Sequence, residues 1–197
     1  MASLFSEQTL TCVRESWSPG IGDPDIMGWV TVGVYVISAF CSLALAARIP
    51  ADQPHAARER VFWAVIGMIL TFLAINKQLD LQSAMTALGR CLAQLQGWYD
   101  ERQAVQRRFI QWLAIGAISV ALFAAWFLRH SLRRNGLAVL GFAFLLGFVV
   151  IRAVGFHDVD QLIGTRLRSV RLNWVLELSG LVLILVNVLP RLLSGRK

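Results

Sequence analysis

The sequence lacks the short motifs that accompany most catalytic and metal-binding sites. It has no glycine-rich phosphate loop, no HExxH, no GxSxG and no CxxC. Histidine is scarce, with only His55, His130 and His157. The first two fall on one side of the expected membrane bundle and the third on the other, so they cannot form a zinc site together. We therefore assign no catalytic residue, metal site or cofactor from motifs.

Cysteine is equally scarce, and the spacing and number of its three residues argue against a cysteine metal site and a disulfide framework. Cys12, Cys41 and Cys91 do not have the spacing of metal ligands, and an odd count is not a disulfide framework. Cys41 lies in the middle of an apolar segment, where a small packing residue is expected. Cys12 and Cys91 fall on the same expected side of the protein. The sequence leaves open whether they are bridged.

Alternation of polar and apolar residues is also missing, which excludes a membrane β-barrel. Instead, 56% of the 197 residues are hydrophobic, and the mean hydropathy of +0.59 arises from five long apolar runs in series. We predict an all-α, polytopic integral membrane bundle of five transmembrane helices. The expected spans are 26–47, 61–84, 109–128, 136–156 and 172–189. Glycines and alanines of the fourth run (Ala138, Gly141, Ala143, Gly147) form a face suited to close helix packing.

The expected organisation is one domain with short flanking parts. Residues 1–25 would form an outer N-terminal strap, 26–190 the five-helix domain, and 191–197 a basic cytoplasmic tail. An outer helical segment of about 85–108 would lie between spans two and three. Its apolar residues have helical spacing, and Gly97 is the expected break. This segment either lies on the outer surface or extends the two neighbouring spans.

Net charge is distributed unevenly about these spans, although the two sides hold nearly equal numbers of Lys and Arg. One side receives the loops 48–60 and 129–135 and the tail, which hold nine basic and two acidic residues and carry the whole net charge of +7. Short basic loops beside the spans are typical of the cytoplasmic side. We expect a bacterial-type cytoplasmic (inner) membrane protein with the N-terminus outside and the C-terminus inside. The basic face would contact anionic membrane lipids, and nucleic acid is not needed to explain it.

Three of the apolar runs are too short to cross a bilayer unless they carry polar residues with them. A charged side chain at the centre of a membrane helix costs roughly 2.5–3.5 kcal/mol on insertion scales, so such residues are expected to face one another. This constraint predicts a polar cluster near the outer face. Its expected members are Asn76, Lys77, Gln78, Asp80, Gln82, Arg152, His157, Asp160, Arg171, Asn173 and Glu177.

Helical spacing suggests how this cluster is arranged. Asn76 and Asp80 would share one face of span two, as would Gln78 and Gln82. Glu177 lies in the first turns of span five and needs a cation. We expect a salt bridge from Glu177 to at least one of Lys77, Arg152 and Arg171.

His157 and Asp160 would face together if span four continued for one more turn. Proton transfer by His157 and binding of a hard cation both remain open, beside a structural role as a loop cap or ion pair.

Three functions fit the sequence. The first is a non-catalytic subunit or assembly factor of a membrane complex, with a protein partner. The second is an outer-leaflet binding site for a lipid or quinone headgroup. The third is a membrane-embedded hydrolase or transferase that uses His157 with nearby carboxylates. An odd number of spans without an inverted repeat argues against a transporter.

Overall fold

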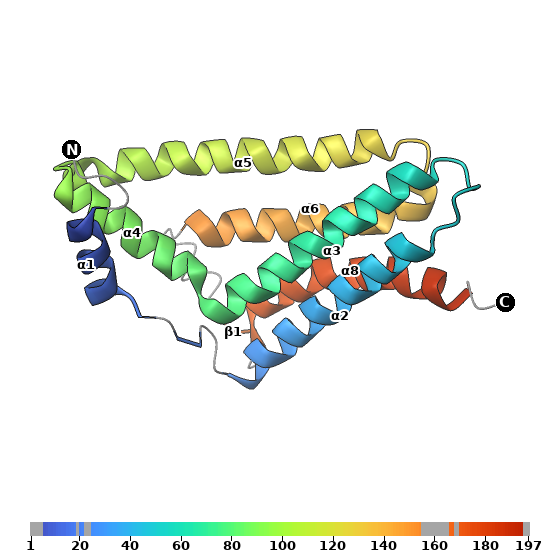
Figure 1. Cartoon of the computed structure of the whole chain (residues 1–197), viewed down its shortest axis with the longest axis horizontal. Helices are drawn as coiled ribbons and strands as arrows, with labels where there is room; N and C mark the ends of the chain where they lie inside the picture. The colour runs from blue at the N-terminus through green and yellow to red at the C-terminus, as the bar shows by residue number, and fades with distance from the viewer. Residues whose placement is uncertain (1–5, 19, 22–24, 155–165, 168–169, 195–197) are drawn as a thin grey trace.

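The computed structural model describes residues 6–18, 20–21, 25–154, 166–167 and 170–194, and these residues are almost entirely helical (Figure 1). In chain order the helices are α1 (Glu7–Ser16), α2 (Ile26–Arg48), α3 (Ala56–Leu79), α4 (Leu81–Leu95), the 3₁₀ turn η1 (Tyr99–Glu101), α5 (Arg102–Phe127), α6 (Leu132–Val154) and α8 (Leu172–Ser194). Two two-residue strands, β1 (Arg166–Leu167) and β2 (Val170–Arg171), pair in antiparallel fashion ahead of α8.

Five of these helices are long and apolar enough to cross a bilayer: α2, α3, α5, α6 and α8. Their apolar stretches run for 18 to 24 residues. About 20 helical residues span the hydrocarbon core of a membrane. The prediction of an all-helical chain with five membrane-length helices is therefore confirmed, and this architecture indicates a membrane protein.

Four of the long helices form the packed body of the protein. α2 packs against α3 and α8, and α6 packs against α8. The core contains fully buried side chains from α3 (Trp63, Leu70), α6 (Leu145) and α8 (Leu181, Ile184). The fifth long helix, α5, has its main contact with α6 and lies along one edge of the bundle in Figure 1.

Two glycines allow α6 and α8 to approach closely. A Cβ atom at Gly141 would lie 2.6 Å from the carbonyl oxygen of Gly180, and a Cβ at Gly180 would lie 2.8 Å from that of Gly141. Ala138 is fully buried in the same helix face. The predicted small-residue face of span four is thus used at these positions. Gly147 is different, because a Cβ there would meet nothing within 4 Å.

The predicted second span of 61–84 is wrong at both ends. Helix α3 begins at Ala56, so it includes Glu59 and Arg60, which the sequence had assigned to a loop. It ends at Leu79 because Asp80 adopts a left-handed backbone conformation with φ of 47°. Aspartate tolerates this conformation better than most residues, and the chain changes direction there.

The fifth span is longer than predicted. α8 continues through Pro190 to Ser194, so Arg191 lies in its last turn rather than in a tail. A proline removes one backbone donor from a helix, and such a loss is tolerated close to a helix end.

α1 and α4 form a small helical layer beyond the ends of α2 and α3. Ser6 caps α1 by accepting the Thr9 N–H. α1 packs on α4, and a disulfide joins Cys12 to Cys91 with a Cα–Cα distance of 6.0 Å. The sequence left open whether Cys12 and Cys91 are bridged, and in the structure they are. Gly97, with φ of 77°, follows α4 as the expected break, and the next helix extends span three.

The close contact of α6 and α8 can be tested by adding a single methyl group. Gly141→Ala forces the two backbones apart and should lower stability by about 1–3 kcal/mol. The measurement is the thermal unfolding midpoint of the protein in detergent micelles, followed by circular dichroism. Gly147→Ala is the matched control in the same helix and should not lower the midpoint. Equal midpoints for the two variants would contradict this packing.

Candidate functional site

Two buried ion-pair clusters lie near opposite ends of α3. We call the first the Glu177 cluster (Tyr35, Lys77, Glu177) and the second the Glu59 cluster (Glu59, Trp63, Arg134, Asn135, Arg191). Lys77 and Glu59 are separated along α3 by about 27 Å at 1.5 Å per residue. Each cluster is therefore a separate candidate site.

The Glu177 cluster joins three helices through one carboxylate. Lys77 Nζ on α3 lies 3.0 Å from Glu177 Oε2 on α8, and Tyr35 on α2 donates its hydroxyl to Oε1 at 3.0 Å. The Lys77 side chain is 11% exposed and that of Glu177 is 5% exposed. The predicted salt bridge of Glu177 is confirmed, with Lys77 as the cation. Tyr35 was not predicted, because a tyrosine in an apolar run gives no sign of which polar group it will reach.

Other expected members on span two do not join this network. The bend at Asp80 ends the helix, so the predicted pairing of Asn76 with Asp80 on one face is wrong, and so is that of Gln78 with Gln82. Within the described part of the chain, the side chains of Asn76, Gln78 and Asp80 make no hydrogen bond or ion pair.

The remaining expected members are only partly covered by the structure. Arg152 belongs to α6, Arg171 to β2 and Asn173 to α8, but their side chains lie outside the described set, as does that of Gln82. His157 and Asp160 lie outside the described residues altogether. Their place in the cluster stays a prediction.

The Glu59 cluster surrounds a carboxylate that is completely buried. Arg134 Nη2 on α6 lies 2.6 Å from Glu59 Oε1, and Arg191 Nη2 on α8 lies 2.7 Å from Oε2. Glu59 itself is 0% exposed. A buried carboxylate is stable only when charge partners and hydrogen bonds replace its water, and here two arginines do so.

An asparagine completes this network. Asn135 Oδ1 accepts from Arg191 Nη1 at 2.6 Å and from Trp63 Nε1 at 3.0 Å. Its Nδ2 donates to the carbonyl oxygen of Ser131 at 3.1 Å. Each of these polar groups has a partner, so the cluster ties α3, α6 and α8 together at this end.

Sequence reasoning missed the Glu59 cluster because it placed Glu59 and Asn135 in loops. A signal was present at the helix start. If the helix begins at Ala56, Glu59 falls on the same face as Trp63, Ile66 and Leu70, which are all buried. A carboxylate on the apolar face of a helix requires a cation from a neighbouring element.

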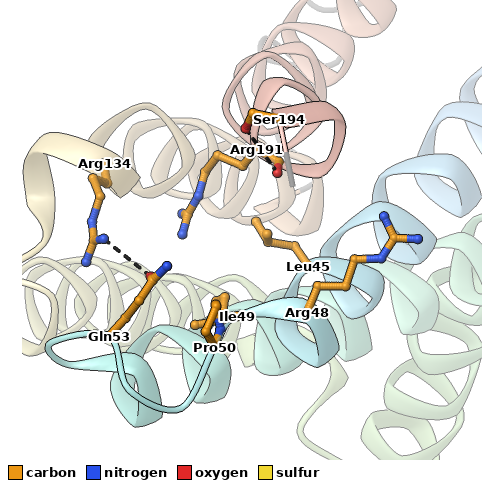
Figure 2. Close-up of a pocket in the computed structure, with 8 residues that line it drawn as sticks. All are labelled: Leu45, Arg48, Ile49, Pro50, Gln53, Arg134, Arg191 and Ser194. Atoms are coloured by element: carbon orange, nitrogen blue, oxygen red, sulfur yellow. Dashed lines mark hydrogen bonds between the residues drawn. The ribbon is translucent and has the colours of Figure 1, made fainter. Parts of the chain in front are cut away.

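A cavity of about 550 Å³ lies beside this cluster (Figure 2). Its walls come from the end of α2 and the loop after it, from the first turn of α6 and from the last turns of α8. The lining residues are Leu45, Arg48, Ile49, Pro50, Gln53, Arg134, Arg191 and Ser194. The guanidinium group of Arg60 donates to the carbonyl oxygen of Ile49 and fixes the loop that forms one wall.

The loops at the Glu59 end of the bundle are rich in basic side chains. His130, in the turn between α5 and α6, stacks on His55 with a ring-centroid distance of 5.0 Å. Partial desolvation lowers the pKa of His130, and the nearby Arg129, His55 and Arg58 lower it further. The basic loops therefore favour the neutral imidazole.

Both clusters consist of a carboxylate held by cationic and hydrogen-bonding side chains from neighbouring helices. Among the described residues, no group of three or more His, Cys, Asp and Glu side chains is placed to hold a metal ion. The arrangement fixes helices, and the cavity beside the Glu59 cluster offers space for a ligand.

No family model matches the chain, and no curated protein or solved structure is detectably similar to it. Functional inference therefore depends on the geometry of these residues.

The Glu177 cluster can be tested by removing its charges one at a time. Glu177→Gln leaves Lys77 without its carboxylate and should lower stability by about 1–3 kcal/mol. The double variant Glu177→Gln with Lys77→Gln should recover much of this loss. Thermal unfolding in detergent checks both. If the single variant were as stable as the wild type and the second change rescued nothing, the cluster would not be structural.

Proposed function

We propose that the protein is a non-catalytic subunit or assembly factor of a membrane complex, and that α5 is the helix through which it binds its partner. The observation that carries this proposal is the isolation of α5. None of the apolar stretch Arg107–Phe127 is buried, whereas 28–39% of the corresponding stretch is buried in each of the other four long helices.

The exposed surface of α5 is large and mostly apolar. Trp112 is 72% exposed, Leu122 66% and Phe123 60%. Apolar side chains alone are equally compatible with contact to lipid tails, since membrane helices gain nothing from the hydrophobic effect when they associate. The polar and small residues of α5 are therefore the features that distinguish a helix that contacts lipid from one that contacts a partner protein.

Gln111, Gly116 and Ser119 favour a protein. All three are exposed, and Gly116 and Ser119 lie near the middle of the apolar stretch. A Cβ atom at Gly116 would meet nothing within 4 Å, so the glycine is not needed for packing inside this chain. Small residues and hydrogen-bonding side chains at mid-membrane are typical of helix–helix contacts. The partner expected here is an apolar transmembrane helix of another protein.

The two ion-pair clusters support a non-catalytic role. Their carboxylates are held by Lys77 and Tyr35 at one end and by two arginines at the other. The headgroup-binding alternative depends on the whole predicted polar cluster at the outer face, and the hydrolase alternative depends on His157 with nearby carboxylates. Several of these side chains, including His157 and Asp160, lie outside the described set. No contact among the described residues favours either alternative over a structural cluster.

We also propose that the Cys12–Cys91 end faces an oxidising compartment and that the Glu59 end faces the cytoplasm. Disulfides persist outside the cytosol, and the basic loops at the other end of α3 fit the cytoplasmic side. Two independent features, one covalent and one electrostatic, support the same orientation in a bacterial-type inner membrane.

The α5 interface can be tested by enlarging its glycine. Gly116→Leu fits within the chain itself but fills the surface where a partner helix would pack. We expect the variant to fold normally and to lose its partner, measured by native mass spectrometry of protein extracted from its own membranes in mild detergent. Gly33→Leu on α2 is the matched control, because its Cβ also meets nothing within 4 Å. A wild-type protein that is repeatedly a bare monomer of 21.9 kDa would overturn the proposal.

The orientation can be tested with a membrane-impermeant maleimide on intact cells. Cys12, which is half-buried, should react only after reduction, and Cys41 should stay unmodified because it is buried and lies within α2. A reporter fused after Lys197 should be active only in the cytoplasm. Reaction of unreduced Cys12, or an external reporter, would contradict the bridge or the orientation respectively.

A further inference from the structure

The cavity beside the Glu59 cluster is lined by arginines that are far apart in the sequence. Arg48 ends α2, Arg134 lies in the first turn of α6, and Arg191 lies in the last turn of α8. In Figure 2 the guanidinium groups of Arg134 and Arg191 both point toward the space between the helices and the loop at Gln53. Three helices thus bring cations to one hollow.

The charges at this hollow do not balance. Three arginines line it, and the guanidinium groups of Arg134 and Arg191 both pair with the carboxylate of Glu59. Glu59 cancels one of these two charges and leaves a surplus of one, to which Arg48 adds a second positive charge at the rim. Arg48 makes no ion pair or hydrogen bond in the described part of the chain, and its side chain extends away from the other two in Figure 2. An anion is the ligand that such a site would favour.

Glu59 positions two of the arginines in advance. Each guanidinium group has five N–H donors in a fixed plane, and the bonds to Glu59, Asn135 and Gln53 use only some of them. The side chains of Arg134 and Arg191 are 45% and 21% exposed, so their remaining donors are accessible. A ligand would therefore bind without first ordering these side chains.

We propose that this cavity binds a phosphate group, and that the group belongs to the headgroup of an anionic phospholipid. The planar fork of arginine matches the oxygens of a phosphate in paired hydrogen bonds. The surplus positive charge is complementary to an anionic headgroup.

The position of the cavity favours a lipid over a soluble phosphate. It lies where α2 and α8 end and α6 begins, which is the level of the headgroups if these helices span a bilayer. Leu45 and Ile49 give its wall an apolar part suited to the glycerol and upper acyl carbons of a lipid. This site is at the opposite end of α3 from the outer-leaflet site considered from the sequence, and it does not depend on the α5 interface.

Native mass spectrometry of the purified full-length protein in detergent can count bound lipids directly. The probes are phosphatidylglycerol, phosphatidylcholine of the same chain length, and glycerol 3-phosphate as the soluble phosphate. We expect one phosphatidylglycerol to bind more tightly than any further copy, and phosphatidylcholine and glycerol 3-phosphate to bind at least tenfold more weakly.

Arg48→Gln removes one cation from the cavity without breaking a contact in the described residues. It should weaken binding of the first phosphatidylglycerol by about fivefold, the effect of one cation beside an anionic lipid. Arg133→Gln is the matched control, because Arg133 is exposed in the same region, does not line this cavity and makes no ion pair or hydrogen bond within the described part of the chain. Ser194→Phe fills the cavity without changing charge and should weaken binding as well, whereas Ser194→Ala should not.

Each outcome decides the proposal. Losses confined to Arg48→Gln and Ser194→Phe support it. Equal losses in Arg48→Gln and Arg133→Gln would show diffuse attraction to the basic face and would overturn the site. Binding of glycerol 3-phosphate as tight as that of phosphatidylglycerol would keep the phosphate site and overturn its assignment to a lipid.

Discussion

Burial of the Glu59 carboxylate is the constraint on which the packed body of this protein depends. A fully buried charge is tolerated only with partners, and these come from the first turn of α6 and the last turns of α8. Meeting that demand fixes where both helices lie relative to α3. The Glu177 cluster makes a similar demand near the other end of α3, where Lys77 contacts α8 and Tyr35 comes from α2. The two carboxylates thus tie the bundle at two levels, while Gly141 and Gly180 bring α6 and α8 together between them.

The sequence predicted the parts of this arrangement that follow from the free-energy cost of placing charged side chains in a membrane. Five apolar runs had to be helices, and Glu177 had to find a cation. Lys77 was among the named partners because both residues sit at similar depth in expected spans. The Lys77–Glu177 salt bridge could therefore be predicted from the expected depth of the two residues alone.

The sequence failed where backbone conformation decided the outcome. Nothing in the run from Asn76 to Gln82 marks Asp80 as the residue that turns left-handed, so one continuous helix was expected where the chain bends. The start of α3 was placed five residues late because the charges of Glu59 and Arg60 resembled a loop. Tertiary partners made those charges compatible with a helix. The isolation of α5 was likewise invisible, since hydropathy does not distinguish a helix packed in the bundle from one at its edge.

The Cys12–Cys91 disulfide closes a ring in the chain across a sequence separation of 79 residues. That ring contains both α2 and α3, and α4 carries the second sulfur. The ring can close only when α1 and α4 lie together at the same end of the α2–α3 hairpin. If that end faces the oxidising compartment proposed above, the bond forms only in chains whose first hairpin is already in place. A chain whose first hairpin does not form would keep two free thiols, one on α1 and one on α4, and would differ covalently from the finished protein.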